Sequence, residues 1–334
     1  MRALRLRAPV MAAASLAAIA LSCAGAPPAG GSGETQAAER LFNAGNYAAA
    51  ISNLQTVVSQ SSSSAEGYYW LGRSYYEISD YDSAVAQAEK SVALDPKNSV
   101  YHQWLGRAYG AKADRDHSFS LAKKVKKEFQ TAVSLNPSNI EARRDLEEYC
   151  LDAPWIVGGS KDEALEQVNA IAALDPVQGH LARAVYNREA LKKPDDAEAE
   201  IRQVLAARPK SIDPYLEVAN FFQAQDKPTD MAAAVQAASE TTPNDPRLSY
   251  YHGVVAVLAG NATSVAERDL KSYLASTPDR SDWPPHAAAR EWLGRLYESQ
   301  GKRAEAAEQY RAALQLDPKR REAKARLAKL EKSQ

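Results

Sequence analysis

The chain has 334 residues, of which 45% are hydrophobic and 25% charged, with 41 basic and 42 acidic side chains and two Cys. This composition excludes a wholly disordered or collagen-like chain, and two Cys are too few for a disulfide-stapled scaffold. The near-neutral charge argues against non-specific nucleic-acid binding, so no nucleic-acid partner is expected.

The amino terminus is predicted to be a targeting signal. Three Arg within the first seven residues precede an apolar core over 10–21, which is shorter than the roughly 20 apolar residues that a bilayer span needs. This core runs into the sequence IALSC, which ends at Cys23 and resembles the lipobox of bacterial lipoprotein signals. The resemblance implies that 1–22 is a lipoprotein signal peptide and that Cys23 is acylated. The alternative is ordinary cleavage after Ala26, which would give a soluble exported protein.

Residues 23–36 are predicted to form the lipidated Cys and a flexible Pro/Gly/Ser linker, which suits a tether between a lipid and a domain. Ala24, in place of Asp, directly after the Cys resembles lipoproteins sorted to an outer membrane. The expected location is therefore the bacterial cell envelope, with a lipid anchor in the outer membrane facing the periplasm. Removing 1–22 takes away three of the 41 basic residues, which leaves 38 against 42 acidic ones and a net charge of −4.

The rest of the chain is repetitive. Three copies of the sequence WLGR-x-Y begin at Trp70, Trp104 and Trp292. Prolines recur 33 to 41 residues apart, each after an amphipathic helical run: Pro96, Pro137, Pro176, Pro209, Pro243, Pro278 and Pro318. A period near 34 residues with a closing Pro indicates stacked helix–turn–helix units, because Pro prevents the second helix from continuing. The pattern resembles the tetratricopeptide repeat.

That resemblance implies an all-α fold, a right-handed α-solenoid of about eight repeats over 37–320 with a C-terminal capping helix over 321–334. The clearest copies are 287–320 and 65–98. Four further copies are inferred mainly from their second helices and prolines: 139–178, 179–211, 212–245 and 246–286. No unit can bury its apolar face alone, so neighbouring units must stack. In the resembled family the first helices line a concave groove that binds a protein or peptide.

Three segments carry residues beyond the period and are expected to be loops: 111–120, 152–160 and 279–286. Such loops either lie on a binding face or simply pack onto the repeats through Trp155 and Trp283. Lys193-Pro194 is expected to be a shortened turn. Cys150 lies on a helical stretch without a disulfide partner, so it is expected to be a small buried hydrophobe.

The sequence shows no motif of a catalytic or metal-binding site. The five His are scattered without metal-ligand spacing, and the sequence contains no HExxH, CxxC or GxSxG motif. We therefore predict no metal, no cofactor and no enzymatic activity. A dense set of lysines is expected to be a solvated helix face: Lys123, Lys124, Lys126 and Lys127.

A candidate groove surface lies on the first helices of the second and third units: Tyr69, Arg73, Tyr76, Gln103 and Arg107. Tyr69, Arg73 and Tyr76 are four and three positions apart, so they share one helix face. Stacking of the units would place Arg73 beside Arg107, whose own face includes Gln103. Two Arg near Tyr side chains could hold a carboxylate through bidentate hydrogen bonds.

The alternative is that these Arg pair within the array. Arg295 has Glu291 and Glu298 on its own face, and Arg73 has an acidic residue four positions on, whereas Arg107 has none three or four positions away. Arg107 is thus the better candidate for a free side chain. The family's clamp for carboxyl-terminal peptides uses Lys and Asn at these places, so its specificity is not implied here.

The function expected from these features is a non-enzymatic, lipid-anchored tetratricopeptide scaffold or adaptor that binds a protein or peptide partner in its groove. One alternative is a structural subunit of an envelope assembly machine. Another is an envelope enzyme with catalytic residues in loops near Trp155 or at Asp116-His117.

Overall fold

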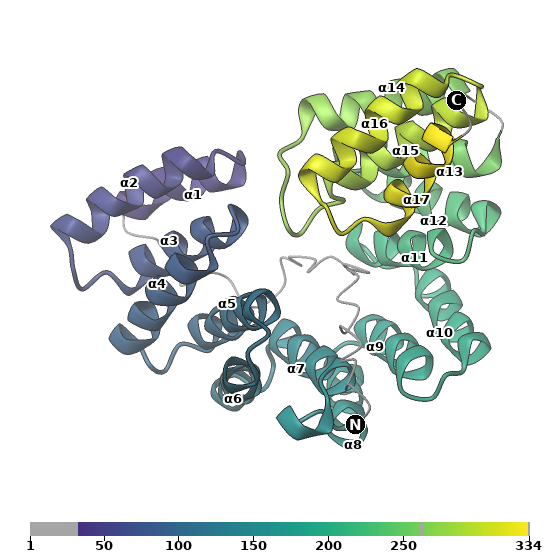
Figure 1. The fold of residues 1–334 in the computed structure, drawn as a ribbon. Helices are drawn as coiled ribbons and strands as arrows, with labels where there is room; N and C mark the ends of the chain where they lie inside the picture. The colour runs from purple at the N-terminus through teal and green to yellow at the C-terminus, as the bar shows by residue number, and fades with distance from the viewer. Residues whose placement is uncertain (1–32, 261–262, 333–334) are drawn as a thin grey trace, which may run out of the picture. The chain divides into compact units, whose positions relative to one another are not determined.

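The computed structural model describes residues 33–260 and 263–332, which form seventeen α-helices and one short 3-10 helix without any strand (Figure 1). The predicted signal peptide, Cys23 and most of the linker lie outside the described residues. Helix α1 begins at Gly33, so 33–36 are helical instead of linker and the array starts four residues earlier than predicted. Within the described ranges, no helix is long and apolar enough to cross a bilayer.

Sixteen of the helices form eight helix–turn–helix pairs, and a last helix follows them. The pairs are α1 (Gly33–Asn43) with α2 (Tyr47–Gln60), α3 (Ala65–Glu77) with α4 (Tyr81–Leu94), α5 (Ser99–Asp116) with α6 (Phe119–Leu135), α7 (Ile140–Asp152) with α8 (Lys161–Leu174), α9 (Pro176–Glu189) with α10 (Pro194–Ala206), α11 (Asp213–Gln223) with α12 (Pro228–Thr241), α13 (Leu248–Ala259) with α14 (Thr263–Ser276), and α15 (His286–Ser299) with α16 (Arg303–Leu316). Helix α17 (Arg321–Lys332) is the cap. The predicted all-α array of about eight repeats with a capping helix is confirmed.

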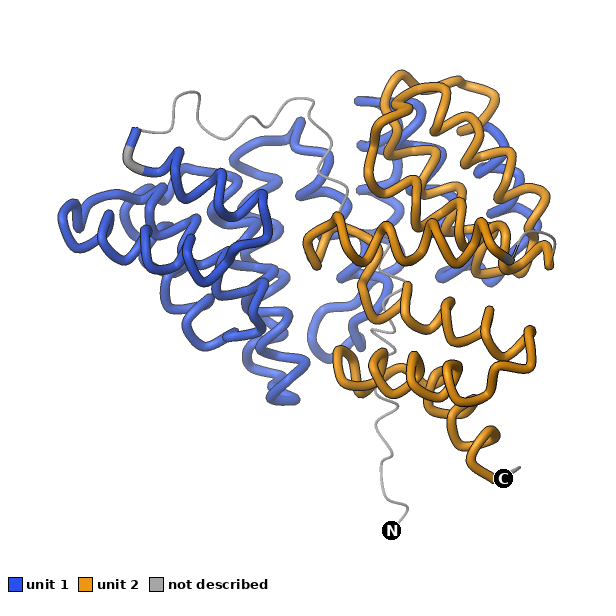
Figure 2. The backbone as a smooth tube through the Cα atoms, turned by 90° about the horizontal axis from the view of Figure 1, so that it is seen from above, with its two compact units in different colours: residues 1–13, 22–203 blue, residues 14–21, 204–334 orange. Residues whose placement is uncertain are grey.

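The described chain divides into two compact units, 33–203 and 204–332 (Figure 2). In the first unit, the first helices α1, α3, α5 and α7 each pack against their own second helix and against the first helix of the next pair, so the series ends at α9. In the second unit, α15 packs in the same way against α13 and α16, and α17 packs on α16. In these series the first helices are direct neighbours, so side chains from successive repeats meet.

Short polar side chains start many of the helices. Asp80 accepts a hydrogen bond from the backbone of Ser83, and Asp175 caps α9 in the same way just before Pro176 at the first helical position. Such a cap stabilises a helix by about 1 kcal/mol, because it satisfies a backbone N–H that has no partner inside the helix. Local sequence therefore defines these helix starts.

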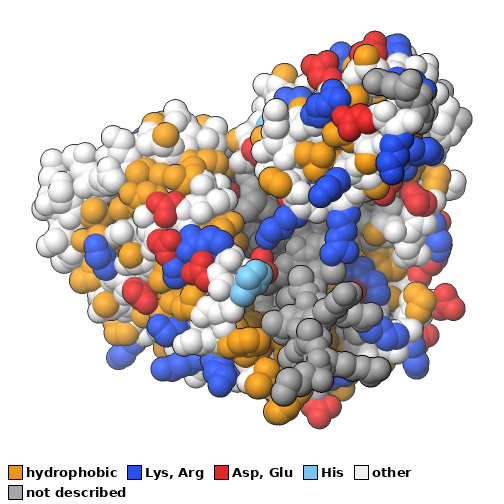
Figure 3. All heavy atoms as spheres, in the orientation of Figure 1, with side chains coloured by type: hydrophobic (Ala, Val, Ile, Leu, Met, Phe, Trp, Pro, Cys, Tyr) orange, Lys and Arg blue, Asp and Glu red, His pale blue; other side chains and the backbone are white. Residues whose placement is uncertain are grey.

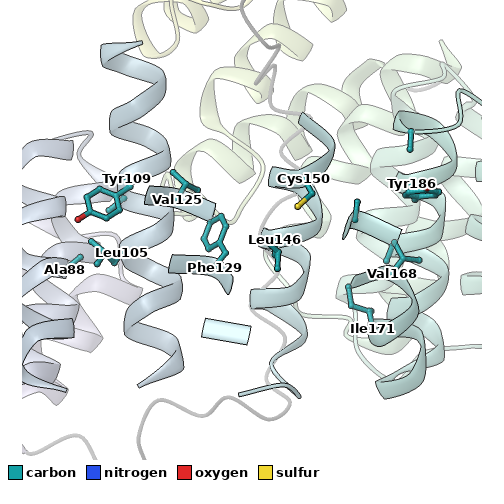
Figure 4. Packing of buried hydrophobic residues seen from close by; sticks show 14 of the residues in the cluster. Ala88, Leu105, Tyr109, Val125, Phe129, Leu146, Cys150, Val168, Ile171 and Tyr186 are labelled. Atoms are coloured by element: carbon teal, nitrogen blue, oxygen red, sulfur yellow. The ribbon is translucent and has the colours of Figure 1, made fainter. Parts of the chain in front are cut away.

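Apolar residues gather between the helices, while charged side chains of both signs are interspersed over the surface in Figure 3. Figure 4 shows the central cluster of the first unit, where Leu105 and Phe129 from the α5–α6 pair lie near Leu146 and Cys150 from α7. Cys150 is buried, and burial raises the pKa of its thiol to about 12. It is neutral and inert near pH 7, so the prediction of a small buried hydrophobe is confirmed.

Two glycines on α5 give a matched pair of substitutions. A Cβ added at Gly106 would lie 2.5 Å from the buried Phe129 ring, whereas one at Gly110 would meet only a Val125 methyl group at 3.9 Å. We expect Gly106→Ala to lower the free energy of unfolding by about 1 kcal/mol or more, because overpacking outweighs the gain in helix propensity. Gly110→Ala should raise it by up to about 1 kcal/mol. Urea unfolding measures both, and equal stabilisation by the two would contradict the close packing.

The three extended segments adopt different structures. Residues 111–116 and 119–120 are helical, so the loop predicted over 111–120 is wrong: the extra residues lengthen α5 and α6, and only His117, at a φ of 51°, and Ser118 form the turn. Residues 111–116 contain no Gly or Pro, and four of the six are Ala, Lys or Arg, which favour helix. Residues 152–160 contain η1 (Trp155–Val157), and α10 begins at Pro194, which confirms the turn at Lys193-Pro194.

The tryptophans of the other two segments also differ. Trp283 lies over the guanidinium groups of Arg280 and Arg247, whose Cζ atoms are 5.3 and 5.9 Å from its ring centroid, so its predicted packing onto the repeats is confirmed. Trp155 is 84% exposed, so the same prediction is wrong for it. The segment 152–160 therefore presents an indole to solvent.

Stability is expected to depend on pH through His102. Its two ring nitrogens lie 2.6 Å from a Glu128 carboxylate oxygen and 3.0 Å from the Pro96 carbonyl, so both face acceptors and only the imidazolium satisfies both. The hydrogen bond to Glu128 raises the pKa of His102 despite burial. Because the folded pKa is raised, this stabilisation is full below the unfolded value of about 6.5 and is lost as pH rises through the folded value.

The check is urea unfolding of the wild type and His102→Gln between pH 5.5 and pH 8.5. We expect the difference in unfolding free energy between the two proteins to shrink as pH rises. Burial lowers the pKa of His252, so that group acts in the opposite direction, and it cancels in the comparison. A difference that is constant or grows with pH would show that His102 is held neutral.

Candidate functional site

The five predicted groove residues lie on α3 and α5, two first helices that pack against each other. Tyr69 is buried, with its ring centroid 5.3 Å from that of Trp70 and 5.2 Å from that of Tyr101. Its hydroxyl accepts a hydrogen bond of 3.1 Å from Nη1 of Arg73. Tyr69 is therefore a support for the arginine and offers little surface of its own.

Arg73 is held among aromatic rings. Its guanidinium carbon lies 4.2 Å from the ring centroid of Trp104, 4.6 Å from that of Phe42 and 4.7 Å from that of Trp70. Each such contact attracts the cation to the negative face of a ring. The Nε atom is buried and has no hydrogen-bond partner in the described part of the chain. Arg73 is thus fixed by stacking while one of its donors stays unused.

Arg107 pairs with the next repeat. Its Nε lies 2.8 Å from Oδ2 of Asp145 on α7, and both side chains are 14% exposed. Glu141 of the same helix lies 3.6 Å away. The prediction that Arg107 is unpaired was therefore wrong. That prediction considered only residues three or four positions away on the same helix, whereas Asp145 is 38 positions further along the chain.

Gln103 and Tyr76 complete this layer. Gln103 is buried, donates a 2.8 Å hydrogen bond to Asp145 and accepts one of 3.2 Å from Asn139. The Tyr76 ring meets Trp104 edge to face, with centroids 6.0 Å apart. Since Arg107 also lies over Trp104, at 4.8 Å, the two arginines share one indole, and the expected placement of Arg73 beside Arg107 is confirmed.

In the equivalent layer of the second unit, the first helix supplies the acids and the following chain supplies the arginines. Glu291 pairs with Arg320 at 2.7 Å, and Glu298 pairs with Arg326 of α17 at 3.0 Å. Arg295, for which these two acids were the expected partners, makes no hydrogen bond or ion pair with any residue that the structure describes. The predicted pairing of Arg295 was therefore wrong, because arginines that follow α16 occupy both acids.

Arg295 lies in an open hollow between helices of the second unit. The hollow is lined by Val257 from α13, by Arg295, Glu298 and Ser299 from α15, and by Arg326 from α17. The guanidinium carbon of Arg295 sits 3.9 Å from the ring centroid of Trp292. Burial, together with the nearby Arg326, lowers the pKa of Arg295, which stays charged. A stacked guanidinium without an acid partner can bind a carboxylate through two parallel hydrogen bonds.

The residues named for an enzymatic alternative are not assembled into a site. Asp116 pairs with Arg115 at 2.7 Å and with Lys112 at 3.1 Å, and the pKa of its carboxyl is lowered to about 2 by these hydrogen bonds. Neighbouring His117 is exposed at the turn. No group of three His, Cys, Asp or Glu side chains suited to a metal ion occurs within 33–260 and 263–332.

Two segments match family models described as tetratricopeptide repeat, residues 35–99 and residues 287–320. The chain contains tetratricopeptide repeats. The first matched segment covers the two pairs from α1 to α4, and the second covers the α15–α16 pair that carries Arg295. The matched segments thus include α3 of the first layer and α15 of the second, but not α5 and α7.

Several solved structures are similar to this helical array. One is a chain of the APC/C hetero-tetramer Cut9-Hcn1, with 13% identity and a TM-score of 0.49 over 88% of this chain and 54% of that one, so this chain spans about half its length. Another is a tetratricopeptide repeat protein from Parabacteroides merdae, with 16% identity and a TM-score of 0.47 over 80% of this chain and 98% of that one. A third is the C-terminal part of a repeat-containing protein from Cytophaga hutchinsonii, with 18% identity and a TM-score of 0.42 over 88% and 99% of the two chains. Among curated proteins, none is a significant sequence match.

Proposed function

We propose that this chain is a lipid-anchored scaffold of the bacterial cell envelope that binds a protein or peptide partner along the face of its first helices. Tetratricopeptide repeats support protein binding in general terms. The finer proposal depends on Arg295, a stacked guanidinium without an acid partner in an open hollow. A partner that presents a carboxylate, from an acidic side chain or a chain end, fits this chemistry.

Within the first unit, Arg73 is the proposed contact because it is partly exposed and makes no ion pair with any residue that the structure describes. Tyr69 and Trp104 hold its guanidinium in place. Gln103 and Arg107 are proposed to shape the layer through Asp145 instead of meeting the partner directly. Tyr76 would border the same surface, since its ring lies against Trp104.

The groove proposal is tested by cross-linking the protein in its native envelope and identifying what it captures. We expect Arg295→Gln to weaken capture of the partner at least about tenfold, since a hydrogen bond to a charged group contributes roughly 1.5–3 kcal/mol. Arg290→Gln is the matched control, because Arg290 lies on the same helix and bonds to Gln309. If Arg295→Gln and Arg73→Gln both captured the partner fully, the groove proposal would be rejected.

The anchor is tested separately by mass spectrometry of the mature amino terminus. An acylated Cys23 as first residue is expected, and Cys23→Ser should release the protein from membranes. An unacylated start at Pro27 would reject the anchor while leaving the groove proposal intact. Fractionation of the two membranes would then report the proposed outer-membrane location.

A further inference from the structure

A group of apolar side chains projects from the first unit beside α6. Trp155 is 84% exposed, the largest exposed fraction among the large hydrophobic residues that the structure describes. Ile156 follows it at 57%, and Phe119 at the start of α6 is 50% exposed. Large apolar side chains that protrude to this extent commonly mark an interaction surface.

Hydrogen bonds fix η1 against α6 and so bring these side chains together. The Tyr149 hydroxyl lies 2.6 Å from the carbonyl of Ala122 on α6 and 2.8 Å from that of Val157 on η1. One turn further along α6, Lys126 donates a 2.7 Å hydrogen bond to the Gly158 carbonyl. Phe119 is three positions before Ala122, on the face of α6 that meets η1. It therefore lies about one helical turn from the segment that carries Trp155.

Free lysines adjoin the same surface. Lys123 and Lys127 are exposed, four and eight positions after Phe119, and neither makes an ion pair within the described residues. Lys126 between them is paired with Glu163 at 2.5 Å. Figure 3 shows apolar and basic side chains next to one another over α6. The predicted solvated lysine face is thus bordered by apolar groups.

We propose that this patch, made of Phe119, Lys123, Lys127, Trp155 and Ile156, contacts an anionic phospholipid bilayer. Trp favours the headgroup level of a membrane, where its ring is buried and its N–H stays hydrated. Lysines with no acid partner are attracted to lipid phosphates. The proposal rests on the proposed envelope location only for the presence of a membrane, because the patch lies outside the groove and does not include Cys23.

A bilayer fits these observations better than a protein does. The apolar side chains protrude from a turn and a helix end, and each is at least half exposed. Protein interfaces place their strongest contacts in desolvated pockets, whereas a membrane interface needs no shape complementarity. The patch also lies within one unit, so its geometry does not depend on the other unit.

The test uses the full chain with vesicles of phosphatidylglycerol and phosphatidylcholine, part of the lipid being brominated to quench tryptophan on contact. We expect vesicle-dependent quenching that is lost in Trp155→Ser and kept in Trp283→Phe. Lys123→Gln and Lys127→Gln should each lower the vesicle binding constant obtained from Trp155 quenching about fivefold. Neutral vesicles or 0.5 M salt should weaken it as well, because both reduce attraction between lysines and phosphates.

Quenching that is equal in the wild type and Trp155→Ser would overturn the proposal, since this readout is specific to one side chain and independent of how the amino terminus attaches. Equal quenching on neutral and anionic vesicles would also overturn it. A photo-cross-linker at position 155 that captures a protein instead of lipid in native envelopes would assign the patch to a protein partner. None of these outcomes affects the groove or the acylation of Cys23.

Discussion

Replacing Asp145 with Ala is expected to lower the free energy of unfolding of the first unit by about 3–5 kcal/mol, the range for removing one partner of a buried ion pair. Asp145 holds Nε of Arg107 at 2.8 Å and the amide of Gln103 at 2.8 Å. Without it, the Arg107 guanidinium stays buried with Glu141, at 3.6 Å, as its only acid partner among the described residues. Urea unfolding and hydrogen exchange of the α5 and α7 amides measure the loss.

Two further variants separate this effect from a general loss of charge. Glu141→Gln removes a more exposed and more distant acid, so it should cost no more than about 1 kcal/mol. The double substitution Arg107→Met with Asp145→Leu should regain most of the loss, because apolar side chains of similar size replace a buried pair without an uncompensated charge. If Asp145→Ala were no worse than Glu141→Gln, the ion pair would not stabilise the layer.

Relations inside one helix were predictable from the sequence. The WLGR motif places Trp and Arg three positions apart on one helix face. In all three copies the arginine lies over its own tryptophan, at 4.7 Å for Arg73, 4.8 Å for Arg107 and 3.9 Å for Arg295. The period of the prolines likewise located seven of the eight helix pairs, all except α1–α2, since a closing Pro and a following cap act on their own neighbours.

Relations between repeats were not predictable from the same rules. Arg107 seemed free and Arg295 seemed paired when only neighbours three or four positions away were considered. In a stack of repeats, however, the partner of a side chain on one first helix comes from about one period further along the chain. Asp145 and Arg326 are such partners, at separations of 38 and 28 residues from Arg107 and Glu298. A search for opposite charges one repeat apart would have found both.

The inserted residues show a second limit of prediction from the repeat period. A deviation from 34 residues indicates how much extra chain is present, but its conformation depends on composition. Residues 111–116 contain neither Gly nor Pro and extend a helix, whereas Pro154, Gly158 and Gly159 interrupt the second segment. Gly158 has a φ of 107°, which favours glycine, and the turn that it ends leaves Trp155 exposed.

Arg247 should be the corresponding weak point of the second unit, where Arg247→Ala is expected to cost about 3–5 kcal/mol. Its guanidinium contacts Asp213 at 2.8 Å and Asp245 at 2.7 Å, and all three side chains are at most 13% exposed. Burial already raises the pKa of Asp213, and Arg247 opposes that shift. Removing the arginine therefore raises this pKa further and leaves two acids without their shared cation.

The pH dependence of this loss distinguishes an uncompensated carboxylate from a simple loss of packing. A folded pKa above the unfolded one gives stability that falls as pH rises, so the cost of Arg247→Ala should be smaller at pH 5 than at pH 7. Arg268→Ala, which removes an exposed arginine beside Asp269, should cost less than about 1 kcal/mol at either pH. Arg247→Lys should fall between the two, because it keeps the charge but loses the bidentate fork. A cost of Arg247→Ala that is equal at both pH values would mean that lost contact with Trp283, and not the orphaned acids, accounts for the instability.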